Sequence, residues 1–142
     1  MKPRVLIVDD EEKFVDYLRK RLENRELTVA TAYSGEAALD ILAKNAQDVV
    51  VLDVLMPGMD GIATLREIKK REPLTEVIML TGHASVESAI DGMKLGAYDY
   101  LMKPCETDDL VDKIRKAYAR KAEQEERIQQ ARIKELATRR GF

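Results

Sequence analysis

The stretch "DVVVLDVLMPGMDG", residues 48–61, joins a short apolar run to a carboxylate and then to a loop rich in Pro and Gly. Continuous apolar residues, without the alternation of a half-exposed strand, are typical of a strand covered on both faces of a parallel sheet. Pro57 and Gly58 are typical of a turn, and Gly61 opens a helical pattern. The stretch therefore predicts a central strand whose carboxyl end presents Asp53.

Four further runs rich in β-forming residues occur along the chain, each separated from the next by a helical pattern. The five predicted strands are "RVLIVD" ending at Asp9, "LTVATA" from Leu27, "DVVVLD" ending at Asp53, "EVIMLT" ending at Thr81 and "AYDYLM" ending at Met102. Phe14 and Leu18 mark the apolar face of the first helix. Ser34 is a candidate N-cap, and Gly96 is expected to end a helix that starts near Ala84. Five βα units with short loops predict a three-layer α/β sandwich, with helices on both faces of a five-stranded parallel sheet.

The composition limits the classes of protein that need to be considered. The 142 residues, 45% of them hydrophobic, suffice for one globular domain with a single core. A net charge of -2 offers no general attraction for nucleic acid or an anionic membrane. No apolar run approaches the length of a membrane span, and the start of the sequence lacks the pattern of a secretory signal. The lone cysteine, Cys105, excludes an internal disulfide framework. We therefore expect a soluble, cytoplasmic protein without a membrane partner.

Charged and polar side chains stand at the carboxyl ends of four predicted strands. They are Asp9 and Asp10 at the end of the first strand, Asp53 at the end of the third, Thr81 at the end of the fourth and Lys103 just after the fifth. Ligands of such sheets bind outside these ends, near the point where the strand order reverses. Three carboxylates crowded there repel one another unless a cation compensates them, and hard oxygen ligands favour Mg²⁺. With Lys103 as a fixed charge and Thr81 as a donor, the set has the parts that stabilise a transferring phosphoryl group.

Each of these residues also has a simpler interpretation. Asp9 and Asp10 could stabilise the N-terminus of the following helix. Asp53 could be a turn residue, and Thr81 could cap the fourth helix. Four such coincidences at one sheet edge are improbable, so we favour a shared site.

Four motifs resemble those of receiver domains of bacterial two-component response regulators, the CheY-like domains. They are "VDDE" at 8–11, "LDVLMPGMDG" at 52–61, "TGH" at 81–83 and "YLMKP" at 100–104, in the order and at the spacing of that family. The resemblance covers residues 3–118 and assigns residues 1–118 to the receiver domain. It implies the flavodoxin-like strand order 2-1-3-4-5. It also implies a stoichiometric phosphoacceptor switch, with at most slow self-dephosphorylation, rather than a turnover enzyme.

The resemblance implies that Asp53 is the phosphoacceptor. Its phosphodonor would be a phosphohistidine of a sensor histidine kinase, or a small phosphodonor molecule. Asp10, Asp53 and the backbone carbonyl of Leu55 are then expected to bind Mg²⁺ directly, and Asp9 through water. Magnesium is therefore the expected cofactor, and a sensor histidine kinase is the expected partner.

Lys103, Thr81 and Tyr100 take the remaining roles that the resemblance implies. Lys103 contacts the phosphoryl group, and its bond to Pro104 is expected to be cis. Thr81 moves towards the new phosphate and Tyr100 follows inward. The change biases an existing equilibrium and alters the surface of the fourth helix, fifth strand and fifth helix, through which a homodimer could form. For Tyr100, ordinary packing in a strand is the simpler alternative.

Leu55 and His83 flank the expected site, at positions that tune the lifetime of the phosphate in the family. The apolar side chain of Leu55 cannot orient a water molecule for hydrolysis, which predicts a comparatively long-lived phosphoaspartate. The imidazole of His83 could position such a water, or His83 could be an exposed loop residue. These two alternatives stay open at the level of sequence.

Residues 119–142 form a charged extension beyond the receiver. They carry seven Lys and Arg against four Asp and Glu, a net charge of +3, whereas residues 1–118 carry 17 against 22, a net charge of -5. Residues 107–140 contain no Gly or Pro, which predicts that the fifth helix runs on to about Arg139. Lys121 and Gln124 interrupt the heptad pattern, so the sequence does not secure a long coiled coil. The extension could be a solvated helix, a dimerising helix or a linker to an output domain outside this sequence.

Two classes of function remain. The first is a switch that a sensor histidine kinase phosphorylates and whose output is protein contact or dimerisation. The second is an interaction scaffold that acts through the C-terminal helix without phosphorylation. Direct DNA binding is disfavoured, because a charge of +3 over the extension is weak and the sequence has no second helical DNA-reading module. A flavin carrier is disfavoured too, because the four acids at residues 9–12 would repel a phosphate.

Overall fold

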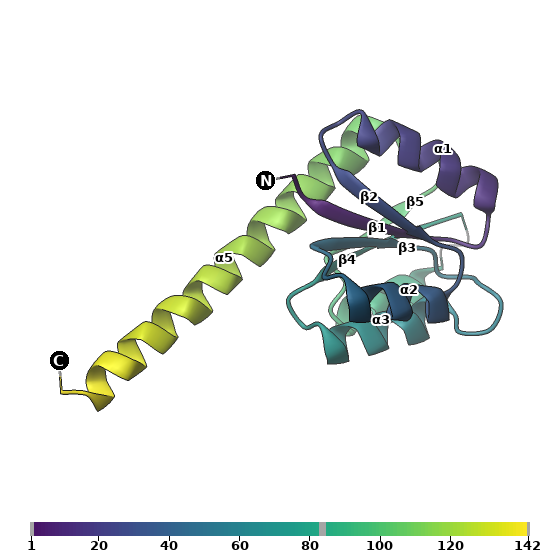
Figure 1. The fold of residues 1–142 in the computed structure, drawn as a ribbon. Coiled ribbons are helices and arrows are strands. Elements are labelled where there is room, and N and C mark those ends of the chain that lie inside the picture. The colour runs from purple at the N-terminus through teal and green to yellow at the C-terminus, as the bar shows by residue number, and fades with distance from the viewer. Residues whose placement is uncertain (1, 83–84, 142) are drawn as a thin grey trace.

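The computed structural model describes residues 2–82 and 85–141, which form a three-layer α/β sandwich (Figure 1). Its middle layer is a parallel sheet of five strands in the order β2-β1-β3-β4-β5. The strands are β1 (Arg4–Val8), β2 (Thr28–Ala32), β3 (Val49–Leu52), β4 (Glu76–Thr81) and β5 (Asp99–Met102). The predicted sheet and its flavodoxin-like strand order are confirmed.

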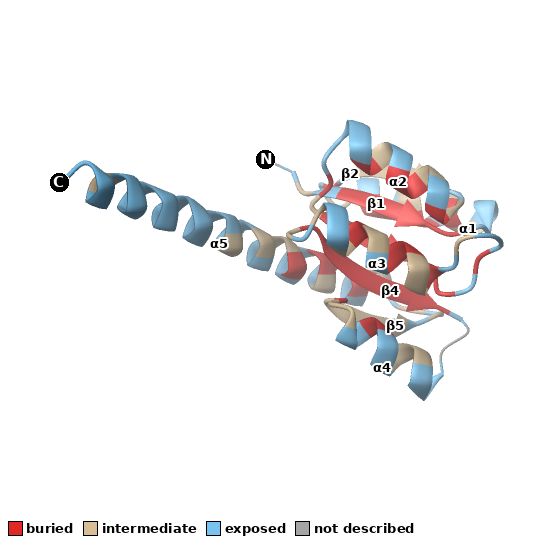
Figure 2. Cartoon of the chain, turned by 90° about the horizontal axis from the view of Figure 1, so that it is seen from below, coloured by how far each residue is buried: buried red, intermediate tan, exposed pale blue. Residues whose placement is uncertain are grey.

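Helices cover both faces of the sheet, as predicted. The helices are α1 (Glu12–Glu23), α2 (Gly35–Lys44), α3 (Gly61–Arg71), α4 (Val86–Lys94) and α5 (Thr107–Arg139). Helix α1 and the first part of α5 pack on one face, and α2, α3 and α4 pack on the other (Figures 1 and 2).

The strand β1 shows why the central strands are continuously apolar. Val5 and Ile7 point into the core under α1 and α5, whereas Leu6 and Val8 point into the core under α2 and α3. Successive side chains of a strand face opposite sides, so a strand covered on both faces has no position left for a polar side chain. Burial of each such side chain contributes about 1.5–3 kcal/mol.

Capping residues explain where α2 and α4 begin and where α4 ends. The hydroxyl of Ser34 accepts the backbone N–H three residues on, at 3.1 Å, which confirms the predicted N-cap of α2. Helix α4 begins after Ser85, which forms a reciprocal capping box with Ser88. The expected start of this helix, Ala84, lies outside the described residues. Gly96 follows the helix with a φ of +101°, a conformation that glycine adopts without a steric penalty.

Helix α5 runs for 33 residues, about 50 Å, and its second half projects away from the sandwich (Figures 1 and 2). Its buried residues all lie in the first part: Leu110, Val111, Ile114 and Ala117. The predicted extension of this helix is thus confirmed. Despite the length of α5, neither it nor another helix in the described ranges is apolar enough to cross a membrane.

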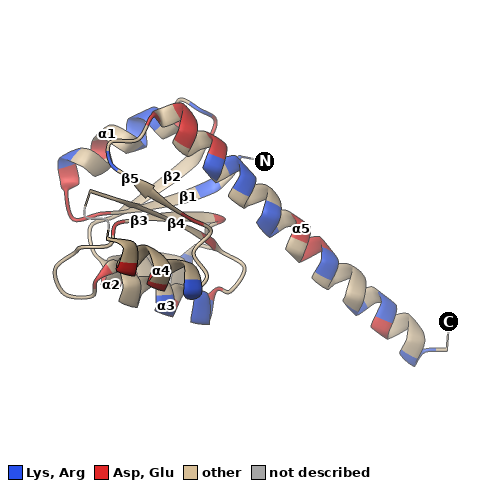
Figure 3. Cartoon of the chain, turned by 180° about the vertical axis from the view of Figure 1, so that it is seen from behind, with Lys and Arg blue, Asp and Glu red and all other residues tan. Residues whose placement is uncertain are grey.

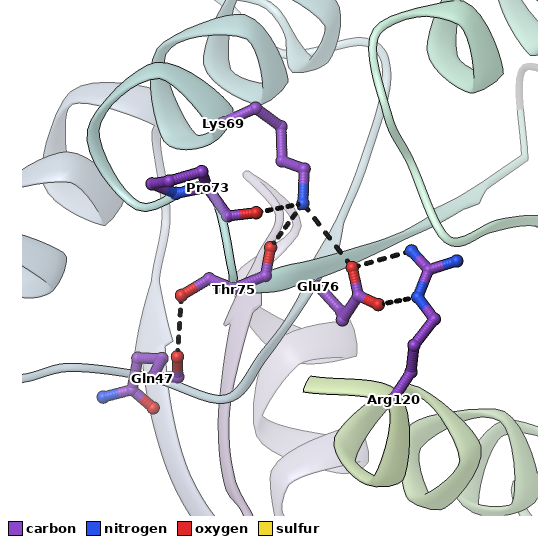
Figure 4. A network of polar contacts seen from close by, with 6 residues as sticks. All are labelled: Gln47, Lys69, Pro73, Thr75, Glu76 and Arg120. Carbon is purple, nitrogen blue, oxygen red and sulfur yellow. Dashed lines mark hydrogen bonds and ion pairs between the residues drawn. The ribbon is translucent and has the colours of Figure 1, made fainter. Parts of the chain in front are cut away.

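A buried carboxylate ties the base of the projecting helix to the sheet (Figure 4). Glu76, at the start of β4, is only 1% exposed. Its Oε1 lies 3.5 Å from the Lys69 ammonium of α3 and accepts from Nη2 of Arg120 of α5 at 2.9 Å, while Oε2 accepts from Nε of Arg120. We call Lys69, Glu76 and Arg120 the Glu76 clamp. It joins α3, β4 and α5 at the end of the sheet opposite to the strands' carboxyl ends.

Further contacts surround the clamp. Lys69 donates to the carbonyl oxygens of Pro73 at 3.1 Å and Thr75 at 2.8 Å (Figure 4). Burial lowers the pKa of Lys69, and the attraction of the Glu76 carboxylate opposes this shift. On α5, the neighbour of Arg120 is Lys121, whose ammonium lies 3.2 Å from a carboxylate oxygen of Asp48. The helix is therefore held to the ends of two neighbouring strands where it leaves the domain.

Candidate functional site

The carboxyl ends of the strands bring four predicted site residues together. Val8 of β1 is paired with Leu52 of β3, so Asp9 and Asp53, which follow them, are neighbours in the sheet. Asp9 is 2% exposed and Asp53 is 3% exposed. Thr81, the last residue of β4, is fully buried, and its carbonyl accepts the N–H of Lys103 at 2.8 Å. Parallel pairing thus collects side chains that are up to 94 residues apart.

Three carboxylates form a cluster that could hold a metal ion. One carboxylate oxygen from each of Asp9, Asp10 and Asp53 lies within 4.8 Å of the others. Asp10 is exposed, so one side of the cluster is open to water. Hard oxygen donors with room for water ligands suit Mg²⁺, which keeps several waters in protein sites. The donor set therefore fits the predicted cofactor.

The negative charge of the Asp53 carboxylate is only partly compensated by its neighbours. Burial raises the pKa of its carboxyl group, and the neighbouring Asp9 raises it further. A hydrogen bond from the Thr81 side chain, the charge of Lys103 and the N–H of Val54, which donates at 2.9 Å, oppose this rise. A bound cation would add compensation at the point where the carboxylates crowd.

The ammonium of Lys103 sits among three groups of the first βα unit. Its Nζ lies 2.5 Å from Oδ2 of Asp9 and 3.8 Å from Oε1 of Glu11. It also lies 4.0 Å from the centre of the Phe14 ring. The peptide bond between Lys103 and Pro104 is cis, as expected. The sequence placed Phe14 on the packed face of α1, and only the structure shows that its ring also meets the site.

Comparison with known families accounts for this geometry. Residues 5–115 match the profile of the family described as the response regulator receiver domain. The chain belongs to the response regulator receiver domain family. Members of this family are phosphoacceptor switches rather than classical enzymes.

Two bacterial transcriptional regulators are similar in sequence to this receiver domain. It is 37% identical over 122 residues to the DNA-binding transcriptional regulator NtrC of Escherichia coli K12, and 42% identical over 115 residues to the transcriptional regulatory protein ZraR of Salmonella typhimurium LT2. These alignments cover 86% and 81% of this chain. The chain spans only 26% of the length of either relative.

Solved structures have the same fold. A response regulator receiver domain protein from Clostridium thermocellum matches with a TM-score of 0.81 and 40% identity, over 84% of this chain and 97% of that one. A CheY-like receiver domain protein from Methanospirillum hungatei matches with a TM-score of 0.84 and 29% identity, over 87% of this chain and 99% of that one.

Tyr100 of the receiver domain is tied to the start of α4. Its ring is partly buried against the core under α2 and α3, and its hydroxyl lies 2.9 Å from the hydroxyl of Ser88. Ser88 belongs to the capping box of α4, so Tyr100 links β5 to the first turn of that helix. Sequence reasoning did not include Ser88, because nothing local in the sequence indicates a partner twelve residues away.

The remaining site residues of the prediction lie at the edge of the cluster or outside the described ranges. The side chain of Leu55 is 53% exposed. His83 lies outside the described residues. Thr81 does not cap α4, since the N-cap of that helix is Ser85. The simpler interpretation of Thr81 as a capping residue is therefore wrong.

Gly61 supports the site from behind. A Cβ atom added at Gly61 would overlap with the carbonyl oxygen of Asp53 and would lie 2.6 Å from Cα of Val54. The N–H of Gly61 donates to the carbonyl of Val54 at 2.8 Å. Glycine lets α3 begin directly against the loop that carries Asp53, which is a closer approach than turn formation alone requires.

Proposed function

We propose that this receiver domain accepts a phosphoryl group on Asp53 from a sensor histidine kinase in the cytoplasm, in a Mg²⁺-dependent reaction, and thereby switches a protein-interaction surface. The observation that carries the proposal is the convergence of three carboxylates with Lys103 at one sheet edge. Division of the chain into a receiver at residues 1–118 and an extension at residues 119–142 belongs to the same proposal.

In the proposed reaction, a carboxylate oxygen of Asp53 attacks the phosphorus of the donor phosphohistidine. The new O–P bond forms as the P–N bond breaks, and the bonding electrons leave with the imidazole. Lys103 provides positive charge and the Thr81 hydroxyl a hydrogen bond to the phosphoryl oxygens. Asp10, Asp53 and the backbone carbonyl of Leu55 would hold Mg²⁺ directly, and Asp9 through water. When bound, the ion neutralises charge on the transferring group.

The proposed switch runs through Thr81 and Tyr100 to the surface of α4. Movement of Tyr100 towards the site would break its contact with Ser88 and so alter the first turn of α4. The surface beside it exposes several large apolar side chains, which favour a protein contact such as a homodimer. They are Val86, Ile90, Met93 and Met102.

The extension supports a second candidate, a scaffold that acts without phosphorylation. Ile128, Ile133 and Leu136 are exposed large apolar side chains on the projecting part of α5. Charged residues of both signs are distributed along this part of the helix (Figure 3). In the proposed switch, by contrast, this helix is a linker to an output domain, consistent with the greater length of the curated relatives. Direct DNA binding by residues 1–142 is not part of either proposal.

Sizing in solution separates the two candidates. The switch predicts that Mg²⁺ with a small phosphodonor changes the oligomeric state of the wild type, and that Asp53→Asn removes this response. The scaffold predicts that the oligomeric state ignores the phosphodonor and changes when residues 121–142 are deleted. Multi-angle light scattering of the three proteins with and without phosphodonor gives the answer.

Leu55→Asn is expected to shorten the lifetime of the phosphorylated form several-fold. An exposed amide beside Asp53 can orient an attacking water molecule, whereas the side chain of Leu55 cannot. The measurement is the decay of the phosphorylated mass after removal of the phosphodonor. Wild-type decay as fast as that of the variant would contradict the expectation. His83→Ala tests the second tuning position in the same assay.

A further inference from the structure

The ammonium of Lys103 has both charged and neutral neighbours, which stabilise it in different ways. Two of its neighbours, Asp9 and Glu11, are carboxylates, whereas the third is the neutral ring of Phe14, 4.0 Å from Nζ. The Lys103 side chain is 15% exposed, so its ammonium has little contact with solvent and depends on its protein neighbours.

The carboxylate contacts depend on what else the site holds. Asp9 belongs to the carboxylate cluster, and any cation bound there competes with Lys103 for the charge of Asp9. Glu11 is a weak alternative, because its side chain is 62% exposed and its oxygen is 3.8 Å away. Phe14 carries no charge, so a cation bound to the cluster does not compete with Lys103 for its ring.

The ring attracts the ammonium without neutralising it. The face of an aromatic ring carries partial negative charge, and a cation within about 6 Å of the centroid is attracted to it. A carboxylate partner would instead repel an incoming phosphoryl group. Phe14 is itself held in place, because it packs against the core cluster between the sheet, α1 and α5.

We propose that Phe14 is a positioning residue. Its ring holds the Lys103 ammonium at the site when the carboxylate of Asp9 is paired with a cation bound at the cluster. The inference rests on the proposed function of Asp53. The ring contacts Lys103 and acts on the reaction only through it.

The test compares Phe14→Leu, which keeps an apolar side chain, with Phe14→Tyr, which keeps the aromatic face. With a small phosphodonor and Mg²⁺, Phe14→Leu is expected to slow phosphorylation of Asp53 by about 3-fold to 30-fold, and Phe14→Tyr to restore the rate. In a Lys103→Met background, Phe14→Leu is expected to cause no further slowing, since the ring then has no ammonium to hold.

A spectroscopic readout tests the contact without the reaction. Methylene protons above a ring face are shifted upfield by the ring current, so the ε protons of Lys103 in metal-free protein are expected to move downfield in Phe14→Leu. The matched control is Tyr17→Leu on the same helix, which removes the ring under Arg21, 4.7 Å from its guanidinium carbon, away from the site. Tyr17→Leu is expected to leave both the rate and the Lys103 shift unchanged.

The possible outcomes distinguish failure of the inference about Phe14 from failure of the proposed function. Equal rates for the wild type and Phe14→Leu, with Asp53 phosphorylated in both, overturn the inference and leave the proposed function intact. A slowing that Phe14→Tyr does not restore, or that persists in the Lys103→Met background, overturns it as well. If the wild type takes up no phosphoryl group, the proposed function fails, and an unshifted Lys103 signal would dismiss the ring contact separately. Phe14→Met replaces Phe14→Leu if the latter fails to fold.

Discussion

Asp53→Asn is expected to abolish uptake of a phosphoryl group. The carboxylate of Asp53 is buried beside Asp9 and Lys103, and an amide at this position is neutral and is a poor nucleophile. The replacement is nearly isosteric and removes a charge that burial penalises, so the fold should be retained. Intact mass after incubation with Mg²⁺ and a small phosphodonor should show one added phosphoryl group for the wild type and none for the variant.

The matched control is Asp60→Asn, in the same loop. Asp60 caps α3 by accepting the N–H of Ala63 at 2.8 Å, and Asn caps helices about as well as Asp. This variant should take up the phosphoryl group like the wild type. If Asp53→Asn still takes up a phosphoryl group, whether at another residue or to the same extent as the wild type, the assignment of Asp53 is refuted.

Glu76→Gln is expected to lower the free energy of unfolding by about 3 kcal/mol. The change leaves Lys69, whose side chain is 19% exposed, without its counter-charge, and it removes the charge that Arg120 meets. The loss should fall near the lower end of the range for broken buried ion pairs, because Arg120 is 46% exposed and can turn to water. Urea unfolding followed by circular dichroism measures the effect.

Two comparisons show whether the buried charge is the cause. Glu67→Gln breaks the largely solvent-accessible pair with Arg71 within α3 and should cost about 0.5 kcal/mol or less. Adding Lys69→Met to Glu76→Gln should recover part of the loss, because no unpaired ammonium then stays buried. If Glu76→Gln is as mild as Glu67→Gln, the clamp does not hold α5 to the sheet. Faster hydrogen exchange just beyond Arg120 in Glu76→Gln would show that the base of the projecting helix has been released.

Much of the fold follows from local patterns. The run at residues 49–52 is apolar at every position and mostly Val, and such a run before a loop rich in Pro and Gly is typical of a strand buried on both faces. Gly96 marks the end of α4 through its backbone conformation, and the absence of Gly and Pro lets α5 continue to Arg139. These signals depend on neighbours in the chain, which is why the sequence indicates them.

Local patterns do not predict the contacts of charged side chains with residues far away in the sequence. Glu76 reads as the first residue of a strand, and nothing near it in sequence identifies Arg120, 44 residues away, as its partner. Phe14 reads as a packing residue, although its ring lies under Lys103. Each pairing depends on which side chains meet after the helices have docked on the sheet.

The amino-acid sequence by itself determined the sandwich of strands and helices and the edge at which Asp9, Asp10 and Asp53 gather, because the parallel order carries every strand end to the same side. Tertiary structure alone decided the partners of these residues and the direction of the projecting helix. Burial and distance in three dimensions set the strength of a charge interaction, and neither can be read from spacing along the chain.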